Sequence, residues 1–406
     1  MIDEPIQDIS TVGVVGAGTM GAGIAQVAAE AALVVLMFDP VDGATGRARQ
    51  RIAGFLERKV EKGQLPAEDV AAAASRISSV ATLEELGAAD LVIEAIPEEL
   101  DLKREAFRRL DAVTPRAILA TNTSSLSIAR IAAATTRPER VVGMHFFNPV
   151  PLMALVEVIA GPLTAPRVVD SVALVARQLG KTPVVAADTP GFIVNRVQRA
   201  MYLEAYRIFE EGAAELAAID DAMREIGFRL GPFELADVVG TDVNLAAGEA
   251  IFAGFYGDPR YRPALVQRRV VDAGRLGRKA GAGYYDYGPD GVRGAPWSAL
   301  RRPAGRPRIV ALDAAQIEAR ILAAIVNEAA SAVADGVGAP EAIDTAMRLG
   351  TNWPEGPLAW GERIGLPAVT RTLDALHAAV PDGRYRVAPL LRTIADQGAS
   401  FFAARA

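Results

Sequence analysis

The chain has 406 residues, about two to three times the usual size of a single domain, so more than one domain is expected. Its 51% apolar and 23% charged residues are close to the average for soluble globular proteins. Its net charge of −6, with no block of consecutive basic residues, argues against a nucleic-acid-binding protein.

Other function classes are excluded by what the composition lacks. Cysteine is absent and histidine occurs twice, which excludes disulfides, a thiolate nucleophile and a His-rich zinc site, so no metal is expected. The N-terminal MIDEPIQDIS is acidic and does not resemble a secretory signal. No apolar run approaches the roughly 20 residues needed to cross a bilayer. The sequence therefore predicts a soluble, cytoplasmic protein that does not bind membranes.

From residue 11 to about residue 163, short β-branched runs alternate with longer amphipathic or Ala-rich stretches. This alternation predicts a parallel sheet wrapped by helices. After residue 192 the spacing of apolar residues is helical, and no further strands are expected.

The first motif, VGVVGAGTMGAG, places Gly16, Gly18 and Gly21 in the G-x-G-x-x-G spacing between a predicted strand and a predicted helix. The first glycine permits a tight turn, the second lets the backbone approach a pyrophosphate, and the third lets helix and strand pack closely. Thr19 and Met20 stand inside this turn and are predicted cofactor contacts as well. The motif predicts a dinucleotide on the positive end of the following helix.

Asp39 ends the next predicted strand, 18 residues beyond Gly21. An acid in this position accepts hydrogen bonds from the adenosine ribose and repels a 2′-phosphate, which favours NAD over NADP. The alternative is a loop acid that merely precedes Pro40. The glycine motif alone also leaves a flavin open.

Polar residues follow two further predicted strands, where the carboxyl ends of a parallel sheet form a ligand crevice. They are Glu98, Lys103, Asn122, Ser124 and Ser125. Glu98 and Lys103 could instead form a charge pair on a solvated helix face. Ser125 could instead cap a helix that begins near Leu126.

His145 lies at the end of another such strand, in VGMHFFNPVP. An imidazole can take a proton from an alcohol as hydride leaves. Glu157 follows twelve residues later in an apolar run, where a buried carboxylate needs a partner such as an imidazolium. The two are predicted to form a base and its orienting group, the alternative being a structural histidine bonded to a backbone carbonyl.

The helical part contains an internal repeat. In the register that starts at Arg196 and Arg320, Glu204 aligns with Glu328 and Asp220 with Asp344, and Gly231-Pro232 aligns with Gly356-Pro357 after one inserted residue. Matches at nearly constant offset argue for a duplication. Between the copies, the Gly-, Pro- and Arg-rich stretch near residues 288–312 is the predicted linker.

The fold class is therefore an α/β Rossmann-type dinucleotide-binding domain followed by two all-α helical domains related by internal duplication. The predicted boundaries are 1–188 for the NAD-binding domain, 189–287 for the first helical domain, 288–312 for the linker and 313–406 for the second helical domain.

Together these motifs resemble the L-3-hydroxyacyl-CoA dehydrogenase family. The matching stretches include GAGTMGAGIAQ, EAIPEELDLK, TNTSSLSI, GMHFFNPVPLMALVEVI, DTPGFIVNR and GRLGRKAGAGYYDY. The resemblance implies NAD-dependent, reversible oxidation of (S)-3-hydroxyacyl-CoA to 3-oxoacyl-CoA, in fatty-acid β-oxidation or related acyl-CoA catabolism.

The resemblance also implies roles for individual residues. His145 matches the catalytic base, Glu157 the carboxylate that orients it, Ser124 the serine that hydrogen-bonds the substrate's 3-oxygen and Asn195 the asparagine that completes the pocket. Asn148 matches a residue near the catalytic centre. The positions that match the nicotinamide side and the ribose acid are Glu98, Lys103, Asn122 and Asp39.

Two positions depart from the family pattern. Gln50 stands where many relatives have a lysine that assists coenzyme A binding, and Ala319 replaces Asn195 in the second helical copy. The second copy is therefore not expected to be an active site. In shorter relatives the single helical domain forms the dimer interface, so the second copy is expected to pack on the first, giving a monomer with an internal pseudo-dimer or a homodimer.

Alternatives from other classes stay open at this stage. They are a non-catalytic dinucleotide-binding structural or sensor protein of the same fold and a 3-hydroxyisobutyrate-type dehydrogenase. Short acyl groups, as in 3-hydroxybutyryl-CoA, and dicarboxylic ones, as in 3-hydroxyadipyl-CoA, are both compatible with the sequence.

Overall fold

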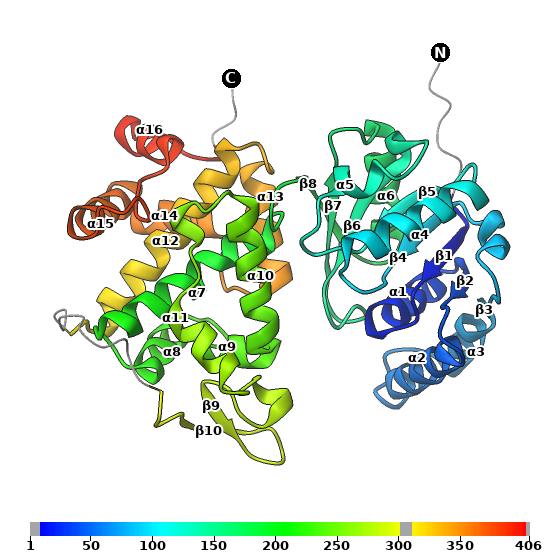
Figure 1. Ribbon diagram of the computed structural model, residues 1–406, viewed down its shortest axis with the longest axis horizontal. Coiled ribbons are helices and arrows are strands. Elements are labelled where there is room, and N and C mark those ends of the chain that lie inside the picture. Colours follow the sequence, from blue (N-terminus) through cyan, green and yellow to red (C-terminus); the bar gives the residue numbers. More distant parts are fainter. Residues whose placement is uncertain (1–8, 301–310, 403–406) are drawn as a thin grey trace. The chain divides into compact units, whose positions relative to one another are not determined.

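The computed structural model describes residues 9–300 and 311–402. The chain divides into two compact units, Met1–Phe192 and Ile193–Ala406 (Figure 1). Part of the predicted linker, residues 301–310, lies outside the described residues.

The first unit is built on an eight-stranded sheet with the strand order β3-β2-β1-β4-β5-β6-β7-β8. The strands are β1 (Thr11–Val15), β2 (Val34–Phe38), β3 (Ile77–Ser79), β4 (Leu91–Glu94), β5 (Ile118–Thr121), β6 (Val141–Phe146), β7 (Leu155–Ala160) and β8 (Thr182–Ala187). The helices are α1 (Thr19–Glu30), α2 (Ala44–Glu61), α3 (Ala67–Ser75), α4 (Leu100–Val113), α5 (Ile128–Ala132) and α6 (Pro166–Gln178), with short 3₁₀ turns at Glu84–Ala88 and Pro138–Arg140.

The central strands are buried along their whole length, which matches their continuous Val, Ile and Leu runs. Residues of α1, α2, α3 and α6 share one apolar core with the sheet. Helices α4 and α5 pack against each other and against β5 and β6. This arrangement holds β1, β4, β5 and β6 parallel, with their carboxyl ends at one edge of the sheet.

The sheet departs from the predicted parallel arrangement at β7. Strand β7 pairs antiparallel with β6, and β8 is parallel to β7, so the sheet is mixed. The reason is the short connection through residues 147–154, because a parallel connection needs a crossover of a dozen or more residues.

The second unit is mainly helical. Its first helices are α7 (Val194–Glu211), α8 (Leu216–Glu225), α9 (Pro232–Val239), α10 (Thr241–Gly254) and α11 (Leu265–Asp272). They are followed by α12 (Ala314–Ala334), α13 (Pro340–Thr351), α14 (Pro357–Ile364), α15 (Leu366–Ala379) and α16 (Pro389–Gln397), with short 3₁₀ turns at Pro259–Tyr261 and Arg278–Ala280. No helix in the described ranges is both long enough and apolar enough to span a bilayer.

The expectation that strands end before residue 192 is wrong in one place. Strands β9 (Tyr285–Tyr287) and β10 (Arg293–Pro296) form an antiparallel hairpin, and β10 lies inside the stretch predicted as linker. The Gly-rich turn between them resembles linker composition, so composition alone did not distinguish a hairpin from a connection.

The repeated sequence motifs occupy matching structural positions. Asp220 on α8 accepts hydrogen bonds from the backbone N–H groups of Phe233 and Glu234 at 2.9 and 3.0 Å. In the same way, Asp344 on α13 accepts bonds from the first turn of α14 at 2.8 and 2.9 Å. Each aspartate thus binds the N-terminus of the following α-helix, where the backbone N–H groups have no partner within the helix.

The glycines of the two GP pairs explain why these positions are repeated. A Cβ on Gly231 would lie 2.3 Å from the Cα of Asp220, and a Cβ on Gly356 would lie 2.3 Å from the Cγ of Asp344. Only glycine allows each helix N-terminus to approach its aspartate so closely.

Helices α7 and α12 pack against each other, and buried ion pairs connect them. Arg196 on α7 binds Glu328 on α12 at 2.7 Å, and Arg320 on α12 binds Glu204 on α7 at 2.5 Å. Tyr261 donates to Glu328 in one half, as Tyr385 donates to Glu204 in the other.

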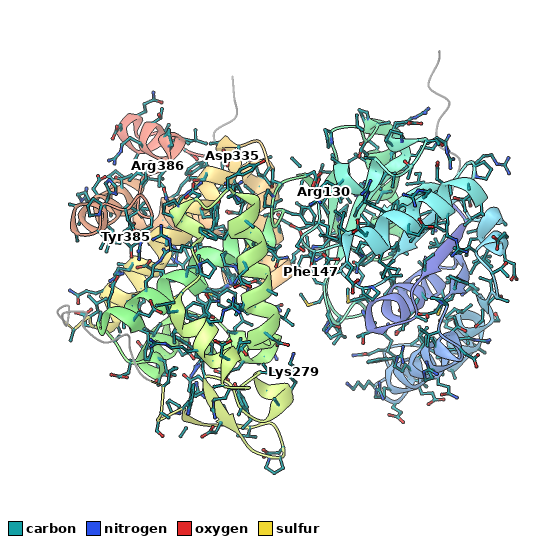
Figure 2. The ribbon with its side chains drawn as sticks, in the orientation of Figure 1. Arg130, Phe147, Lys279, Asp335, Tyr385 and Arg386 are labelled. Carbon is teal, nitrogen blue, oxygen red and sulfur yellow. The ribbon has the colours of Figure 1, made fainter. Side chains whose placement is uncertain are left out.

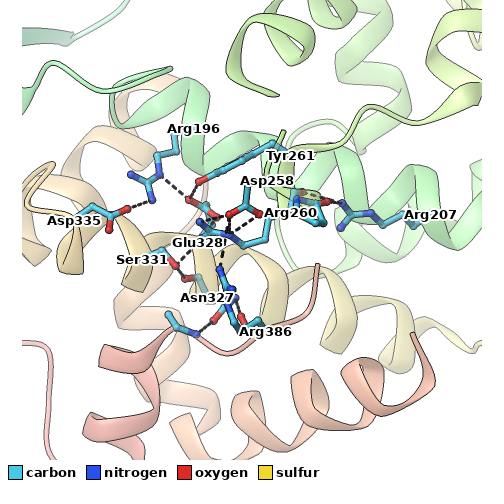
Figure 3. A network of polar contacts seen from close by, with 12 residues as sticks. Arg196, Arg207, Asp258, Arg260, Tyr261, Asn327, Glu328, Ser331, Asp335 and Arg386 are labelled. Carbon is cyan, nitrogen blue, oxygen red and sulfur yellow. Dashed lines mark hydrogen bonds and ion pairs between the residues drawn. The ribbon is translucent and has the colours of Figure 1, made fainter. Parts of the chain in front are cut away.

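Further charges extend the first of these two clusters (Figure 3). Arg196 also binds Asp335 at 2.6 Å, and Arg260 bridges Asp258 and Glu328. Because every arginine here has a carboxylate partner, the buried charges of the α7–α12 contact are compensated.

The two aspartates give a matched stability test. Asp220→Asn is expected to lower the free energy of unfolding by about 1–3 kcal/mol. Both oxygens of the aspartate accept hydrogen bonds, whereas an asparagine side chain has a single acceptor oxygen. Asp344→Asn should cost less, since Asp220 has a third donor, the Tyr285 hydroxyl at 2.8 Å. Urea unfolding of both variants measures the difference. An equal or larger loss in Asp344→Asn would contradict this assignment.

Candidate active site

The glycine turn after β1 has the geometry that a dinucleotide requires. Gly16 has φ +100°, and a Cβ there would lie 2.6 Å from the Ala95 carbonyl oxygen. A Cβ on Gly21 would lie 1.8 Å from the carbonyl oxygen of Gly16, so helix α1 could not pack this closely with any side chain.

Gly18 differs from its neighbours because a Cβ there would meet no atom within 4 Å. It precedes the first turn of α1, and no side chain caps that helix. Open space over an uncapped helix N-terminus fits a pyrophosphate, which binds to backbone N–H groups there. The residues present, including Thr19 and Met20 at the start of α1, therefore fit NAD.

Asp39 lies directly after β2, beside the glycine turn. Its carboxylate accepts from the backbone N–H groups of Ala17 at 2.7 Å and Val41 at 2.8 Å. Arg51 on α2 donates to the Ala17 carbonyl at 2.6 Å and so holds the same turn from the other side. The acid is fixed in the place where an adenosine ribose would meet it.

Replacing Asp39 with alanine is expected to lower the preference for NAD over NADP at least about 10-fold, because the variant removes a negative charge that repels the 2′-phosphate. The ratio of kcat/KM for the two cofactors measures this. Asp42→Ala, an exposed acid three residues on, is the matched control. An unchanged ratio in Asp39→Ala would refute the role of this carboxylate.

A buried charge cluster underlies the end of β4. Glu94, fully buried, accepts from the Lys103 ammonium at 2.6 Å, from the Thr121 hydroxyl at 2.7 Å and from the Ile96 N–H at 2.7 Å. Lys103 is only 1% exposed, so the interpretation of a solvated helix face is wrong for it. Glu94 was missed by the sequence analysis, although an acid inside the apolar run LVIE was a usable signal.

Glu98 accepts hydrogen bonds from several groups of the TNTSS segment, residues 121–125. One of its oxygens accepts from the hydroxyl of Thr123 and from the backbone and hydroxyl groups of Ser124 and Ser125, at 2.7 to 3.2 Å. Burial opposes ionisation of Glu98, but Lys103 and these donors outweigh it and hold the pKa of Glu98 below its usual value. Glu98 thus stays ionised and fixes the position of Ser124.

The helix cap is two residues away from the residue considered for it. Ser127, not Ser125, caps α5, and its hydroxyl accepts from the Arg130 N–H while donating to Asp188 at 2.9 Å. Asn122, after β5, accepts from the Phe146 N–H at 2.8 Å and so ties β5 to the end of β6. Glu98 and Asp188 thus fix the side chains of Ser125 and Ser127, respectively.

His145 and Glu157 lie directly opposite each other on the antiparallel strands β6 and β7. The Nδ1 of His145 is 2.7 Å from Glu157, which is fully buried. The imidazole is 6% exposed, and its ring lies 4.5 Å from that of Phe147 and 6.0 Å from that of Phe192. Figure 2 shows Phe147 among the side chains that follow β6. The pairing leaves Nε2 as the ring nitrogen for another partner.

The last two predicted residues stand on a loop and on a helix. Asn148 follows Phe147, is exposed and precedes a cis peptide bond to Pro149. Asn195 is in the first turn of α7 and belongs to the second unit. The first unit thus brings together His145 and Glu157 at β6 and β7, and Glu98, Ser124 and Lys103 around β4 and β5.

Comparison with known proteins agrees with this geometry. The model of the 3-hydroxyacyl-CoA dehydrogenase NAD binding domain matches residues 11–189, and that of the 3-hydroxyacyl-CoA dehydrogenase C-terminal domain matches residues 191–287 and 317–400. A 3-hydroxyadipyl-CoA dehydrogenase of Escherichia coli is 39% identical over 95% of this chain and 97% of its own length.

Two further matches differ in the length they cover. A probable 3-hydroxybutyryl-CoA dehydrogenase of Bacillus subtilis is 46% identical over 69% of this chain and 98% of its own. The crystal structure of a 3-hydroxybutyryl-CoA dehydrogenase from Escherichia coli matches with a TM-score of 0.87 at 38% identity, covering 96% of this chain and 99% of that one. The chain therefore belongs to the 3-hydroxyacyl-CoA dehydrogenase family and is an oxidoreductase whose first domain binds NAD.

Proposed function

We propose that His145 is the general base with which this NAD-dependent dehydrogenase oxidises (S)-3-hydroxyacyl-CoA to 3-oxoacyl-CoA, and that Glu157 orients it. The observation that carries the proposal is the 2.7 Å contact between His145 Nδ1 and a fully buried carboxylate. A buried carboxylate on one ring nitrogen fixes the tautomer and supports the positive charge that the ring acquires as a base.

In the forward direction, the Nε2 of His145 accepts the proton of the substrate's 3-hydroxyl group. Bound NAD would supply the hydride acceptor for the hydrogen on C3. Glu157 stabilises the resulting imidazolium through Nδ1. In the reverse direction the imidazolium returns the proton to the oxygen of the 3-oxo group. Phe147 and Phe192 shield the ring from water, which strengthens the His145–Glu157 interaction.

Other residues are proposed to position the substrate. On substrate binding the Ser124 hydroxyl turns from Glu98 to donate to the 3-oxygen, while the bond of its backbone N–H to Glu98 holds the residue in place. Asn195, in the first turn of α7, keeps the substrate-binding role that the family resemblance implies for it. Glu94 and Lys103 act as positioning residues, because both side chains are buried. Lys103 forms an ion pair with Glu98 at 3.4 Å, and Glu94 accepts from Thr121 at the end of β5.

The remaining predicted cofactor contacts are proposed on the same grounds. Asn122 and Asn148 flank His145 from the ends of β5 and β6, where the nicotinamide of a bound dinucleotide lies in such sheets. The acyl-CoA substrate itself can be short or dicarboxylic, since the similar proteins carry the names 3-hydroxybutyryl-CoA and 3-hydroxyadipyl-CoA dehydrogenase.

We further propose that the second helical copy replaces a partner subunit. The domain division is then 1–188, 189–287 and 313–406, joined by the stretch 288–312. The reciprocal pairs Arg196–Glu328 and Arg320–Glu204 support this, because a symmetric dimer interface also repeats each contact. The protein is a monomer with an internal pseudo-dimer, or a homodimer through another surface.

A panel of 3-oxoacyl-CoA substrates with NADH tests the function. Oxidation of NADH on at least one member is the expected result. No turnover on any member would refute the activity proposed for this chain, and the His145 variant described in the Discussion tests the mechanism.

A further inference from the structure

An arginine of helix α2 lies against the glycine turn of the cofactor site. The Nη2 of Arg51 donates to the carbonyl oxygen of Ala17 at 2.6 Å and is 3.5 Å from that of Gly18. The Asp39 carboxylate accepts from the backbone N–H of the same Ala17 at 2.7 Å. A cation and an anion thus contact one residue of the turn, the cation at its carbonyl group and the anion at its N–H group. All of these residues belong to the first unit.

The partners of Arg51 differ from those of other cations on α2. Lys59 forms an ion pair with Glu30 at 2.6 Å, and the guanidinium of Arg58 lies over the ring of Phe55. Among the described residues, Arg51 donates only to backbone carbonyl oxygens, and none of its nitrogens forms an ion pair with a carboxylate. Its charge is therefore uncompensated, and its Nε and Nη1 groups are left as donors for another partner.

The adenosine ribose of a bound dinucleotide supplies a partner of this kind. In a site of this fold, an acid after the second strand accepts from the 2′-hydroxyl of NAD, whereas a nearby arginine accepts the 2′-phosphate of NADP. This chain has both groups beside the same turn. A guanidinium offers parallel N–H groups that match two oxygens of a phosphate. We propose that Arg51 binds the 2′-phosphate of NADP(H), so that the enzyme accepts NADPH as a second cofactor beside NADH.

The charges and the open space around the turn support this assignment. Asp39 repels a 2′-phosphate, and the uncompensated charge of Arg51 offsets that repulsion. The bond to the Ala17 carbonyl holds the guanidinium in place, so less side-chain entropy is lost when a phosphate binds. Arg51 is exposed, and a Cβ on Gly18 would meet no atom within 4 Å, so a ligand has access to this side of the turn. NADH stays the preferred cofactor, because Asp39 has no ribose 2′-hydroxyl to bind in NADPH.

The pyrophosphate is the other phosphate group that a dinucleotide brings to this turn. It binds to backbone N–H groups in the first turn of the helix that follows the glycines. Arg51, by contrast, contacts the residue that the ribose acid Asp39 also contacts, which favours the ribose end of the ligand. NADH and NADPH carry the same pyrophosphate, so a comparison of the two cofactors separates these contacts.

Dissociation constants for NADH and NADPH, measured by cofactor fluorescence with the full-length protein, test the proposal. In the wild type, we expect the Kd for NADPH to lie within about 100-fold of that for NADH. Arg51→Met should raise the Kd for NADPH at least about 10-fold and that for NADH less than about 3-fold. Arg58→Met, an exposed arginine two turns further along the same face of α2, is the control and should change neither value.

Two smaller ligands isolate the 2′-phosphate from the nicotinamide. AMP and adenosine 2′,5′-bisphosphate differ only in the 2′-phosphate, and in calorimetry Arg51→Met should weaken binding of the bisphosphate alone. A double-mutant cycle adds the acid. Asp39→Ala should bind NADPH at least about 10-fold more tightly than the wild type, and adding Arg51→Met should remove most of that gain.

Three results would overturn the proposal. They are failure of NADPH to bind to the wild type, an unchanged Kd for NADPH in Arg51→Met, and equal losses for both cofactors, which would assign Arg51 to the pyrophosphate or to folding. The proposal concerns the cofactor alone, and binding is measured without turnover. A failure of the function proposed for His145 therefore leaves these measurements unaffected.

Discussion

His145→Gln is expected to lower kcat by about 10² to 10⁴-fold, the usual contribution of general acid–base catalysis, with little change in the affinity for NADH. Glutamine keeps hydrogen-bonding groups near Glu157 but cannot carry the proton between substrate and solvent. Initial rates with the best 3-oxoacyl-CoA of the panel measure the loss. Cofactor binding, measured by NADH fluorescence, shows whether the glycine turn is intact.

The chain contains its own control for this experiment. His377 on α15 is the other histidine, and His377→Gln should retain full activity. Glu157→Gln should also lower kcat, because the imidazolium loses its buried counter-charge. Undiminished turnover in His145→Gln would exclude His145 as the base, whereas a loss of NADH binding would reassign the effect to the cofactor site.

Removal of the second helical copy, residues 313–406, is expected to abolish the soluble monomer. Arg196 and Glu204 are fully buried on α7, and their partners Glu328 and Arg320 lie on α12. The deletion leaves both charges unpaired and exposes the apolar residues between them, a combination that costs several kcal/mol. The truncated chain should aggregate or form a dimer in which α7 packs on α7.

A charge reversal distinguishes these outcomes. In such a dimer, Arg196 of each chain would face Glu204 of the other, as the two copies do within the full chain. Glu204→Arg in the truncated chain should therefore prevent the dimer, and adding Arg196→Glu should restore it. Light scattering after size exclusion reads out the mass. A fully active, soluble monomer after truncation would contradict the view that the second copy replaces a subunit.

Most of the cofactor half of the site could be predicted from local pattern. The glycine spacing and Asp39 require only that one strand, one turn and one helix follow each other in the chain, and the structure has them in that order. The His145–Glu157 contact could also be predicted, because a carboxylate buried in an apolar strand requires a polar partner. The geometry of that contact could not be predicted, since it depends on β7 running antiparallel to β6.

The residues that escaped prediction have partners far along the chain. Glu94 accepts from Thr121, 27 residues later, and Ser127 donates to Asp188, 61 residues later. Local spacing carries no information about such contacts.

The reciprocal pairs between α7 and α12 also affect how this protein can change by mutation. In a symmetric dimer one substitution appears on both sides of the interface. Here Arg196–Glu328 and Arg320–Glu204 are encoded separately, so each half of the contact can be altered alone. The second copy has Ala319 where the first has Asn195, while both ion pairs are present, a difference between the halves that two identical subunits could not have.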